Sequence, residues 1–374
     1  MAEVPTGSSF FQRFLLPGFA FKAVVIGGGY ATGRELVEYF LPNGPIGGLM
    51  AMGLAMLIWS IVCSLTFVIA FARRSHDYRS FFRGLLGPFW LVFELAYAFF
   101  IIVLLSVFAA AAGAIGGALF GWVPIIGTLC LMAGISMFAT FGNDAVERLF
   151  KYVSIFLYIV YALFVLLSFS RFGDLIAANF TSDIPTGNWI PGGLTYASYN
   201  VVGAVIILPV VRHLTSRRDA VIAGLLAGPL AMLPALLFFV AMVGFYPEIS
   251  GKALPSDYIL GQIGSPLFHF AFQLMIFAAL LESGTGSVHT INERIAAVHR
   301  SRSGRDLPKA FRLAVIVTLL IVSVFVADAF GLIALIASGY RLLAWVILAV
   351  YLLPLFTIGL WQLKTGRLNP TPST

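Results

Sequence analysis

An apolar segment near the N-terminus is interrupted by glycine, and it reads Ala23-Val24-Val25-Ile26-Gly27-Gly28-Gly29-Tyr30-Ala31-Thr32-Gly33-Arg34-Glu35. Each glycine inside a helix costs about 1 kcal/mol relative to alanine. Thr32 and Glu35 have the spacing of a capping box, in which the hydroxyl accepts a hydrogen bond from a free amide and the carboxylate reaches back to the cap. We therefore predict that one helix ends near Ile26 and that another begins near Gly33. Close packing through small residues is the alternative, but it does not account for three adjacent glycines followed by a cap.

The composition around this segment is that of an integral membrane protein. Of the 374 residues, 60% are hydrophobic and only 10% are charged, whereas soluble domains carry about 25% charged residues. A spanning helix needs roughly 20 mostly apolar residues. We predict an all-α fold of about ten transmembrane helices in a single transmembrane domain. The expected spans are 12–40, 46–72, 86–117, 121–141, 146–170, 190–212, 218–246, 263–293, 310–328 and 340–363.

Lysine and arginine alternate between the predicted connections. The N-terminus, the even-numbered connections and the tail hold 18 of them, and the odd-numbered connections hold only Arg171 and Lys252. Positive loops stay on the cytoplasmic side, so we predict an even number of spans in a bacterial cytoplasmic (inner) membrane, with both termini cytoplasmic. The partners expected are the lipid bilayer and a small-molecule substrate. Nucleic acid is not expected, because the basic residues cluster in short loops.

The sixth span carries a second candidate break, at Tyr199, Asn200 and Gly203. Spans one and six correspond if the chain is an inverted repeat of two five-helix halves, 12–170 and 190–363, with an outer connection at 171–189. Leu175–Ala178 in that connection is amphipathic and is expected to form a short surface helix. Glycine-interrupted helices at matching places are typical of a transporter substrate site, because half-helix ends present free amides to an anion and free carbonyls to a cation.

The run from Gly27 to Glu35, with Glu282 and Gly284 in span eight, resembles the signature of the YkvI-like bacterial membrane proteins, within the LeuT-fold amino acid–polyamine–organocation superfamily. The resemblance covers nearly the whole chain. By position it implies a substrate between the breaks of helices 1 and 6, near helices 3 and 8, and a cation between helices 1 and 8. The substrate residues carried over are Gly27, Gly28, Gly29, Tyr30, Tyr199, Asn200, Gly203, Glu94 and Tyr97. Span eight offers Ser283, Thr285 and Ser287 spaced by two, not the adjacent hydroxyl pair often used for sodium.

Ionisable residues inside spans mark a second set of candidates, since they are costly in lipid and face the protein interior. Glu282 reads as a proton carrier or cation ligand, and a structural hydrogen bond is its alternative. Lys22 either neutralises a vacant cation site or extends to the interface, and Glu94 either acts in function or pairs with Lys22. Arg34, Glu35 and Glu38 either gate the outer vestibule or form an exposed pair. Cys63, Cys130 and the histidines do not form a metal-ligand cluster.

These residues predict a secondary active transporter, a cation-coupled symporter of a small zwitterionic or carboxylate solute such as an amino acid or osmolyte. The coupling ion is Na+ or H+, and no other cofactor is expected. A membrane receptor that senses a small ligand on the same fold is the alternative. An enzyme is not expected, because the sequence offers neither a nucleophile with its base nor a metal cluster. Substrate identity, transport direction and oligomeric state are not predicted.

Overall fold

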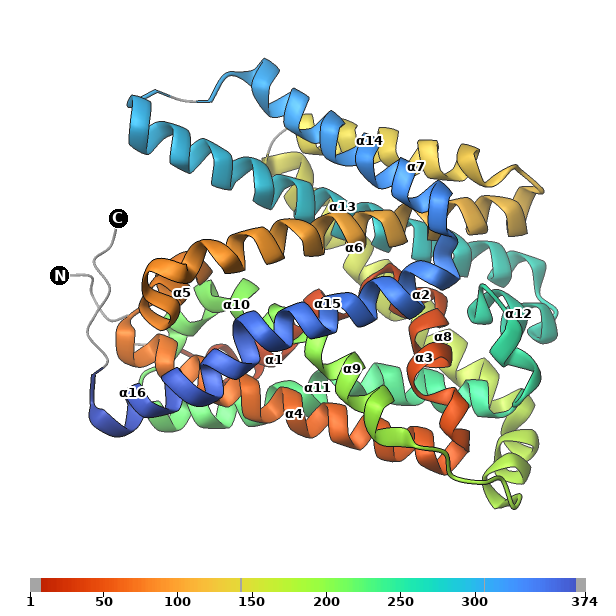
Figure 1. The fold of residues 1–374 in the computed structure, drawn as a ribbon. Helices are drawn as coiled ribbons and strands as arrows, with labels where there is room; N and C mark the ends of the chain where they lie inside the picture. Colours follow the sequence, from red (N-terminus) through yellow and green to blue (C-terminus); the bar gives the residue numbers. More distant parts are fainter. Residues whose placement is uncertain (1–7, 142, 306, 368–374) are drawn as a thin grey trace.

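Helices occupy each of the predicted spans in the computed structural model, which describes residues 8–141, 143–305 and 307–367 (Figure 1). Their bounds are α1 (Leu16–Val25), α2 (Gly28–Thr32), α3 (Arg34–Tyr39), α4 (Gly44–Arg73), α5 (Tyr78–Leu86), α6 (Trp90–Phe120), α7 (Pro124–Phe141), α8 (Asn143–Thr181), α9 (Trp189–Asn200), α10 (Val202–Ile206), α11 (Arg217–Val243), α12 (Pro255–Ile263), α13 (Pro266–Ser303), α14 (Lys309–Ala334), α15 (Tyr340–Ile347) and α16 (Leu360–Thr365). Within these residues, six helical stretches are long and apolar enough to cross a membrane. The all-α membrane fold is as predicted.

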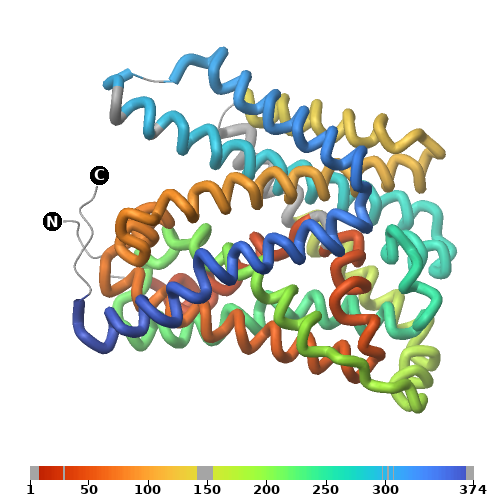
Figure 2. The backbone as a smooth tube through the Cα atoms, in the orientation of Figure 1, coloured from red at the N-terminus to blue at the C-terminus, as the bar shows by residue number. Residues whose placement is uncertain are grey.

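The long helices form two groups (Figures 1 and 2). In one group α4 packs along α11, α1 lies on α11, and α9 lies on α4. In the other group α6 packs against both α7 and α14, and α13 contacts α6 and α7. The short helix α2 reaches from the first group to α6 and α13 of the second. The second predicted span, which is α4, therefore neighbours the seventh, which is α11. The third and fourth spans, α6 and α7, neighbour the eighth and ninth, α13 and α14. This is the pairing expected of a five-plus-five repeat.

Small residues allow a close helix contact between α4 and α11. A Cβ on Gly224 would lie 2.3 Å from the Ser64 backbone, and one on Gly228 would lie 2.3 Å from the Met56 carbonyl oxygen. Ser60 donates a 3.0 Å hydrogen bond across this contact to the Leu225 carbonyl. In lipid, where apolar surface gains little from association, such backbone approach and interhelical hydrogen bonding hold helices together.

Side chains that the sequence places at helix N-termini cap several of these helices. Asp77 accepts a 2.8 Å hydrogen bond from the Ser80 amide at the start of α5, and Ser216 accepts one of 3.1 Å from the Asp219 amide at the start of α11. Ser265 has the same role at α13, followed by Pro266. These residues satisfy amides that would otherwise lack an intrahelical partner.

Several helices run past their predicted ends, among them α13, which continues to Ser303, and α14, which continues to Ala334. α8 continues to Thr181, so Leu175–Ala178 belongs to a long helix and not to a separate surface helix. The connection that follows is accordingly short. α14 bends at Gly331, whose φ of 70° lies in the left-handed region, where a glycine is favoured because it carries no Cβ.

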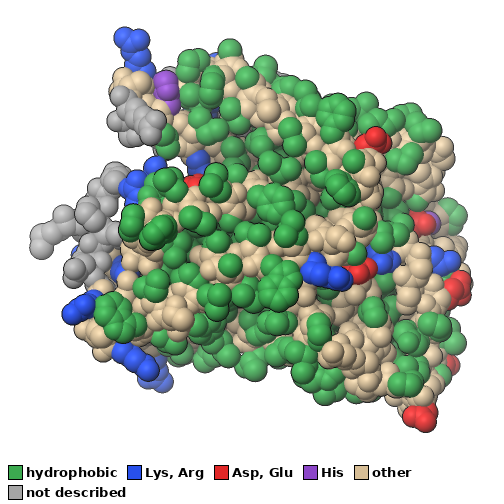
Figure 3. Space-filling view, viewed as in Figure 1, with side chains coloured by type: hydrophobic (Ala, Val, Ile, Leu, Met, Phe, Trp, Pro, Cys, Tyr) green, Lys and Arg blue, Asp and Glu red, His purple; other side chains and the backbone are tan. Residues whose placement is uncertain are grey.

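One end of the molecule gathers the connections that the sequence marks as basic. Arg13 forms a 2.8 Å ion pair with Asp219, joining the first turns of the chain to the start of α11. Arg73, at the end of α4, donates a 2.7 Å hydrogen bond to Gln362 of α16. Figure 3 shows lysine and arginine side chains concentrated at this end, which we call the basic end. The side chains of Arg148 and Lys151 lie outside the described residues. The contacts agree with an even number of crossings, and the cytoplasmic assignment stays a prediction.

Candidate functional site

The first helix is broken at Ile26 and Gly27. α1 ends at Val25, Ile26 has a ψ of 82°, and Gly27 is extended at φ −102° and ψ −171°. The Gly27 amide donates to the Val25 carbonyl at 2.8 Å instead of continuing the ladder to Ala23. Helical bonding resumes when the Ala31 amide donates to the Gly27 carbonyl at 3.0 Å. The predicted end near Ile26 is confirmed, and the new helix begins at Gly28, earlier than predicted.

A second interruption lies at Gly33, between α2 and α3. Its φ is 83°, and a Cβ there would lie 2.3 Å from the Met242 side chain and 3.0 Å from that of Phe238. The predicted capping box is met only in part. The Thr32 hydroxyl accepts a 3.4 Å hydrogen bond from the Arg34 amide, but the N-cap residue of α3 is Gly33, and the Glu35 side chain is buried in the protein core.

Glu35 joins the first helix to the sixth. Its carboxylate accepts a 2.6 Å hydrogen bond from the Tyr199 hydroxyl, and both side chains are buried. The Tyr199 ring contacts the rings of Tyr39, Tyr196 and Tyr340, with centroids 6.0, 5.7 and 4.7 Å away. A buried carboxylate in a membrane protein is costly, so such groups mark functional positions. The position of Glu35 inside an apolar span already indicated a functional carboxylate in the sequence. The predicted capping box assigned it a role at the helix start instead.

The sixth helix is interrupted more mildly than the first. α9 ends at Asn200 and α10 begins at Val202, yet Val201 stays right-handed at φ −62° and ψ −16°. The Ala204 amide donates to Val201 with three-residue spacing. Asn200 is half-buried and donates 3.0 Å to the Tyr196 carbonyl. A Cβ on Gly203 would lie 2.9 Å from the Phe21 ring of α1, so this glycine admits close packing of the two helices.

The α6 residue beside the break is Phe108, whose ring would lie 3.5 Å from a Cβ on Gly27. Glu94 and Tyr97, the expected contacts on this helix, lie nearer the basic end. At 1.5 Å per residue, Glu94 is about 21 Å along α6 from Phe108. Glu94 accepts 2.6 Å from the Tyr78 hydroxyl and pairs with Arg294 at 3.4 Å. The expected pair with Lys22 is therefore replaced by an arginine of α13.

The α13 candidates occupy different surroundings. The Thr285 side chain is fully buried, and its hydroxyl lacks a partner among the described residues. Ser287 donates 2.8 Å to the Ser283 carbonyl of its own helix. Glu282 is half-buried. The α13 residue that lines the space beside the break is Met275, about 10 Å along the helix from Glu282.

Lys22 and Arg34 are both buried and both bonded. The Lys22 ammonium donates 2.6 Å to the Tyr158 hydroxyl of α8. Arg34 forms a 2.8 Å pair with Glu38 and donates to the carbonyls of Ser250 and Lys252 at 3.0 and 3.1 Å. It thus joins α3 to the segment before α12. The surroundings of Gly28 and Gly29 lie outside the described residues.

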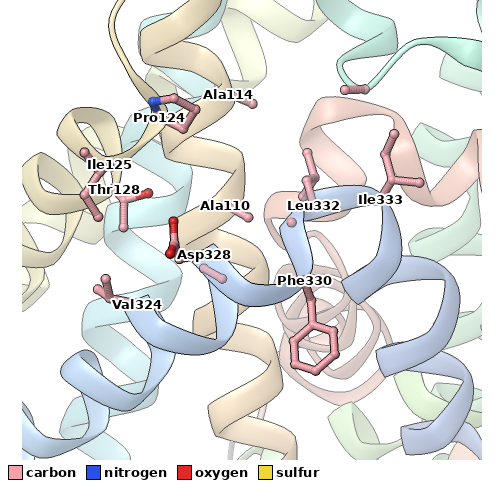
Figure 4. Close-up of a pocket in the computed structure, with 13 residues that line it drawn as sticks. Ala110, Ala114, Pro124, Ile125, Thr128, Val324, Asp328, Phe330, Leu332 and Ile333 are labelled. Atoms are coloured by element: carbon pink, nitrogen blue, oxygen red, sulfur yellow. The ribbon is translucent and has the colours of Figure 1, made fainter.

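The space beside the break is small. A cavity of about 30 Å³ is lined by Ile26, Tyr30, Tyr161, Pro234 and Met275, among others. That volume holds a water molecule but not an amino acid, so this conformation is closed around the break. A larger recess of about 470 Å³ lies between α6, α7 and α14 at the Gly331 bend, where Asp328 and Thr128 face it (Figure 4).

Solved structures with the same arrangement are membrane transporters. The chain superposes on MhsT in complex with L-phenylalanine with a TM-score of 0.63 and 16% identity, over 96% of this chain and 98% of that one. It superposes on a Na+-coupled sialic acid symporter with a TM-score of 0.63 and 13% identity (95% and 82%). A manganese transporter of Eremococcus coleocola gives 0.61 and 16% (94% and 81%). These structures have the LeuT fold, so this chain has it too. The sequence matches no protein-family model and no curated protein.

Proposed function

We propose that the chain is a cation-coupled secondary transporter of a small zwitterionic or carboxylate solute, and that it belongs to the YkvI-like proteins. The observation that carries the proposal is the break at Ile26 and Gly27, in a helix that contacts both helix groups. Unwound backbone at membrane depth persists only where it is buried in protein or lines a cavity. The break supplies polar backbone groups beside a small cavity lined by apolar and tyrosine side chains.

The proposed solute lies against Gly27–Tyr30, between the first helix and Tyr199–Gly203 of the sixth. The Tyr196 hydroxyl is buried without a partner among the described residues, so it can bond to a polar end of the solute. The Gly27 amide donates to the Val25 carbonyl in this conformation and can donate to the solute only when that bond opens. Entry requires α2 to move away from Tyr161 and Met275, because the present cavity is small. The resemblance to a phenylalanine-bound protein supports a zwitterion.

Coupling by protons fits Glu35 best. Its buried carboxylate bonds to Tyr199 across the two broken helices, so gaining or losing a proton would change that link as the helices move. Glu282 remains the second carboxylate for this role. Sodium is the other candidate ion, and Thr285 of α13 is its proposed ligand, because its buried hydroxyl lacks a partner among the described residues. Arg34 is proposed as an outer latch, because it bonds the segment at Ser250–Lys252.

The test is a thermal-shift screen of the purified protein with amino acids, osmolytes and carboxylates, followed by uptake into proteoliposomes. Gly27→Leu is expected to abolish any stabilisation by solute. Gly53→Leu is the matched control, because a Cβ on Gly53 would meet no atom within 4 Å. Uptake is expected to follow an imposed proton or sodium gradient. Stabilisation without uptake would favour the receptor, and a solute effect that survives Gly27→Leu would contradict the site.

A further inference from the structure

A large recess opens at the basic end, away from the helix break. Its volume is about 1170 Å³, and it lies between α5, α6, α13 and the start of α14. The basic residues that line it are Arg79, Arg83, Arg294, His289 and His299. Figure 3 shows a hollow at the upper left, with basic, acidic and histidine side chains around it.

The acidic residues of this recess already have partners in the protein. Asp77 accepts from both the amide and the hydroxyl of Ser80, at 2.8 and 2.7 Å. Glu293 accepts from Arg312 at 2.7 Å. Glu94 accepts from Tyr78 and Arg294, as described above. Glu293 and Glu94 are therefore paired with arginines, whereas Asp77 is bonded to neutral donors of Ser80.

The three arginines are held over aromatic rings, and of these Arg294 is also paired with Glu94. The guanidinium carbons of Arg79 and Arg83 lie 4.8 and 4.6 Å from the Trp90 ring centroid, and neither side chain forms an ion pair with any residue that the structure describes. Arg294 lies 3.7 and 3.8 Å from the rings of Tyr78 and Tyr97. Stacking fixes a guanidinium in place while leaving its N–H groups free for an anion.

We propose that this recess binds the phosphate headgroup of an anionic phospholipid. The apolar residues beside it favour a lipid over a soluble phosphate. Leu91 and Phe311 line the recess and are more than half exposed, and Leu95, one turn further along α6, is 73% exposed. Acyl chains can run along these side chains while the headgroup reaches the arginines. Basic pockets between transmembrane helices are known to bind anionic headgroups.

The orientation of the chain in the membrane does not by itself explain where Arg79 and Arg83 lie. The positive-inside effect needs only cations in solvated loops, and Arg217 and Arg218, exposed at the start of α11, satisfy it. Arg79 and Arg83 instead lie on one amphipathic helix, above one tryptophan, at the wall of a recess. This difference supplies a matched control, because each pair is two charges at the same end of the molecule.

The experiment measures lipid binding to the full chain by native mass spectrometry, with dioleoylphosphatidylglycerol and dioleoylphosphatidylcholine as probes. Arg79→Ala/Arg83→Ala is expected to weaken phosphatidylglycerol binding at least tenfold, whereas Arg217→Ala/Arg218→Ala leaves it within twofold. Arg79→Lys/Arg83→Lys keeps the charge and is expected to retain part of the binding, which guards against a folding defect. Equal loss in both alanine pairs, or equal binding of the two lipids, would overturn the proposal. So would displacement of the lipid by an equal concentration of inorganic phosphate or glycerol 3-phosphate, because the site would then take soluble phosphate.

Discussion

The first and sixth helices hold equivalent places in the repeat but are interrupted differently. The first passes through an extended glycine at Gly27 and a left-handed glycine at Gly33. The sixth keeps right-handed backbone through Val201 and loses only the regular spacing of its hydrogen bonds. A glycine near a break therefore has one of three roles, which are to allow a positive φ, to admit a neighbouring helix, or to leave space. Gly33, Gly203 and Gly27 exemplify these roles in turn, and alanine at each position distinguishes them.

Gly33→Ala is expected to have the largest effect on stability. A left-handed backbone costs a non-glycine residue about 1–2 kcal/mol, and forcing a methyl group against Phe238 and Met242 adds about 1–3 kcal/mol. We expect the free energy of unfolding, measured by SDS titration in mixed micelles, to fall by about 2–5 kcal/mol. A variant as stable as wild type would show that Gly33 does not need its left-handed conformation.

Breaking the link between the two helices is expected to have the next largest effect. Tyr199→Phe removes the hydroxyl that donates to the Glu35 carboxylate, and a buried hydrogen bond to a charged group is worth about 1.5–3 kcal/mol. The same substitution in a Glu35→Leu background should cost much less, because the acceptor is already gone. This double-mutant cycle isolates the pair, and additive losses would contradict a direct link.

Gly203→Ala is expected to cost about 1 kcal/mol. Alanine favours the helical backbone by about 1 kcal/mol, but its Cβ would lie 2.9 Å from the buried Phe21 ring, and overpacking of this kind costs about 1–3 kcal/mol. The unfolding titration used for Gly33→Ala gives the comparison directly. Restoring stability with Phe21→Leu in the same chain would identify the ring as the cause, and failure to restore it would point elsewhere.

Gly27→Ala is expected to change stability least, by less than about 0.5 kcal/mol, as for a substitution without a clash. Its backbone is extended, which any residue adopts, and the added methyl group would meet the Phe108 ring at 3.5 Å. Solute-dependent stabilisation in the thermal-shift assay should nevertheless weaken, because the methyl group occupies space beside the break. A variant with reduced stability but unchanged solute response would show that Gly27 serves the fold alone.

Much of the architecture could be predicted because lipid imposes strict local rules. A spanning segment must be apolar along its length and must satisfy its own backbone, so α4, α6 and α11 are visible as apolar runs. Charge alternation predicted which connections share an end, and the contact of Arg13 with Asp219 agrees with it. The end of α1 near Ile26 followed from the glycine run.

Side-chain partners across the fold could not be predicted in the same way. Glu94 was expected to meet Lys22, yet Arg294, 200 residues along the chain, is its partner. Glu35 was predicted to form a capping box with Thr32, because the two are close in sequence. Its carboxylate instead accepts a hydrogen bond from Tyr199, 164 residues away. The part of α6 beside the break also differs from the prediction, since Phe108 lies there and not Glu94 or Tyr97. The reason is that helix tilt and offset depend on packing between the two helix groups.

The sequence by itself determined that this chain lies in a membrane, where its helices run, which connections share an end and where the first helix must stop. Each of these depends on hydropathy, charge and glycine within a short window. Only the tertiary structure decided that Glu35 meets Tyr199, that Phe108 lies at the break and that three arginines surround one recess. Those contacts arise from how rigid helices pack against one another, and a local stretch of sequence carries no record of the distance between residues on different helices.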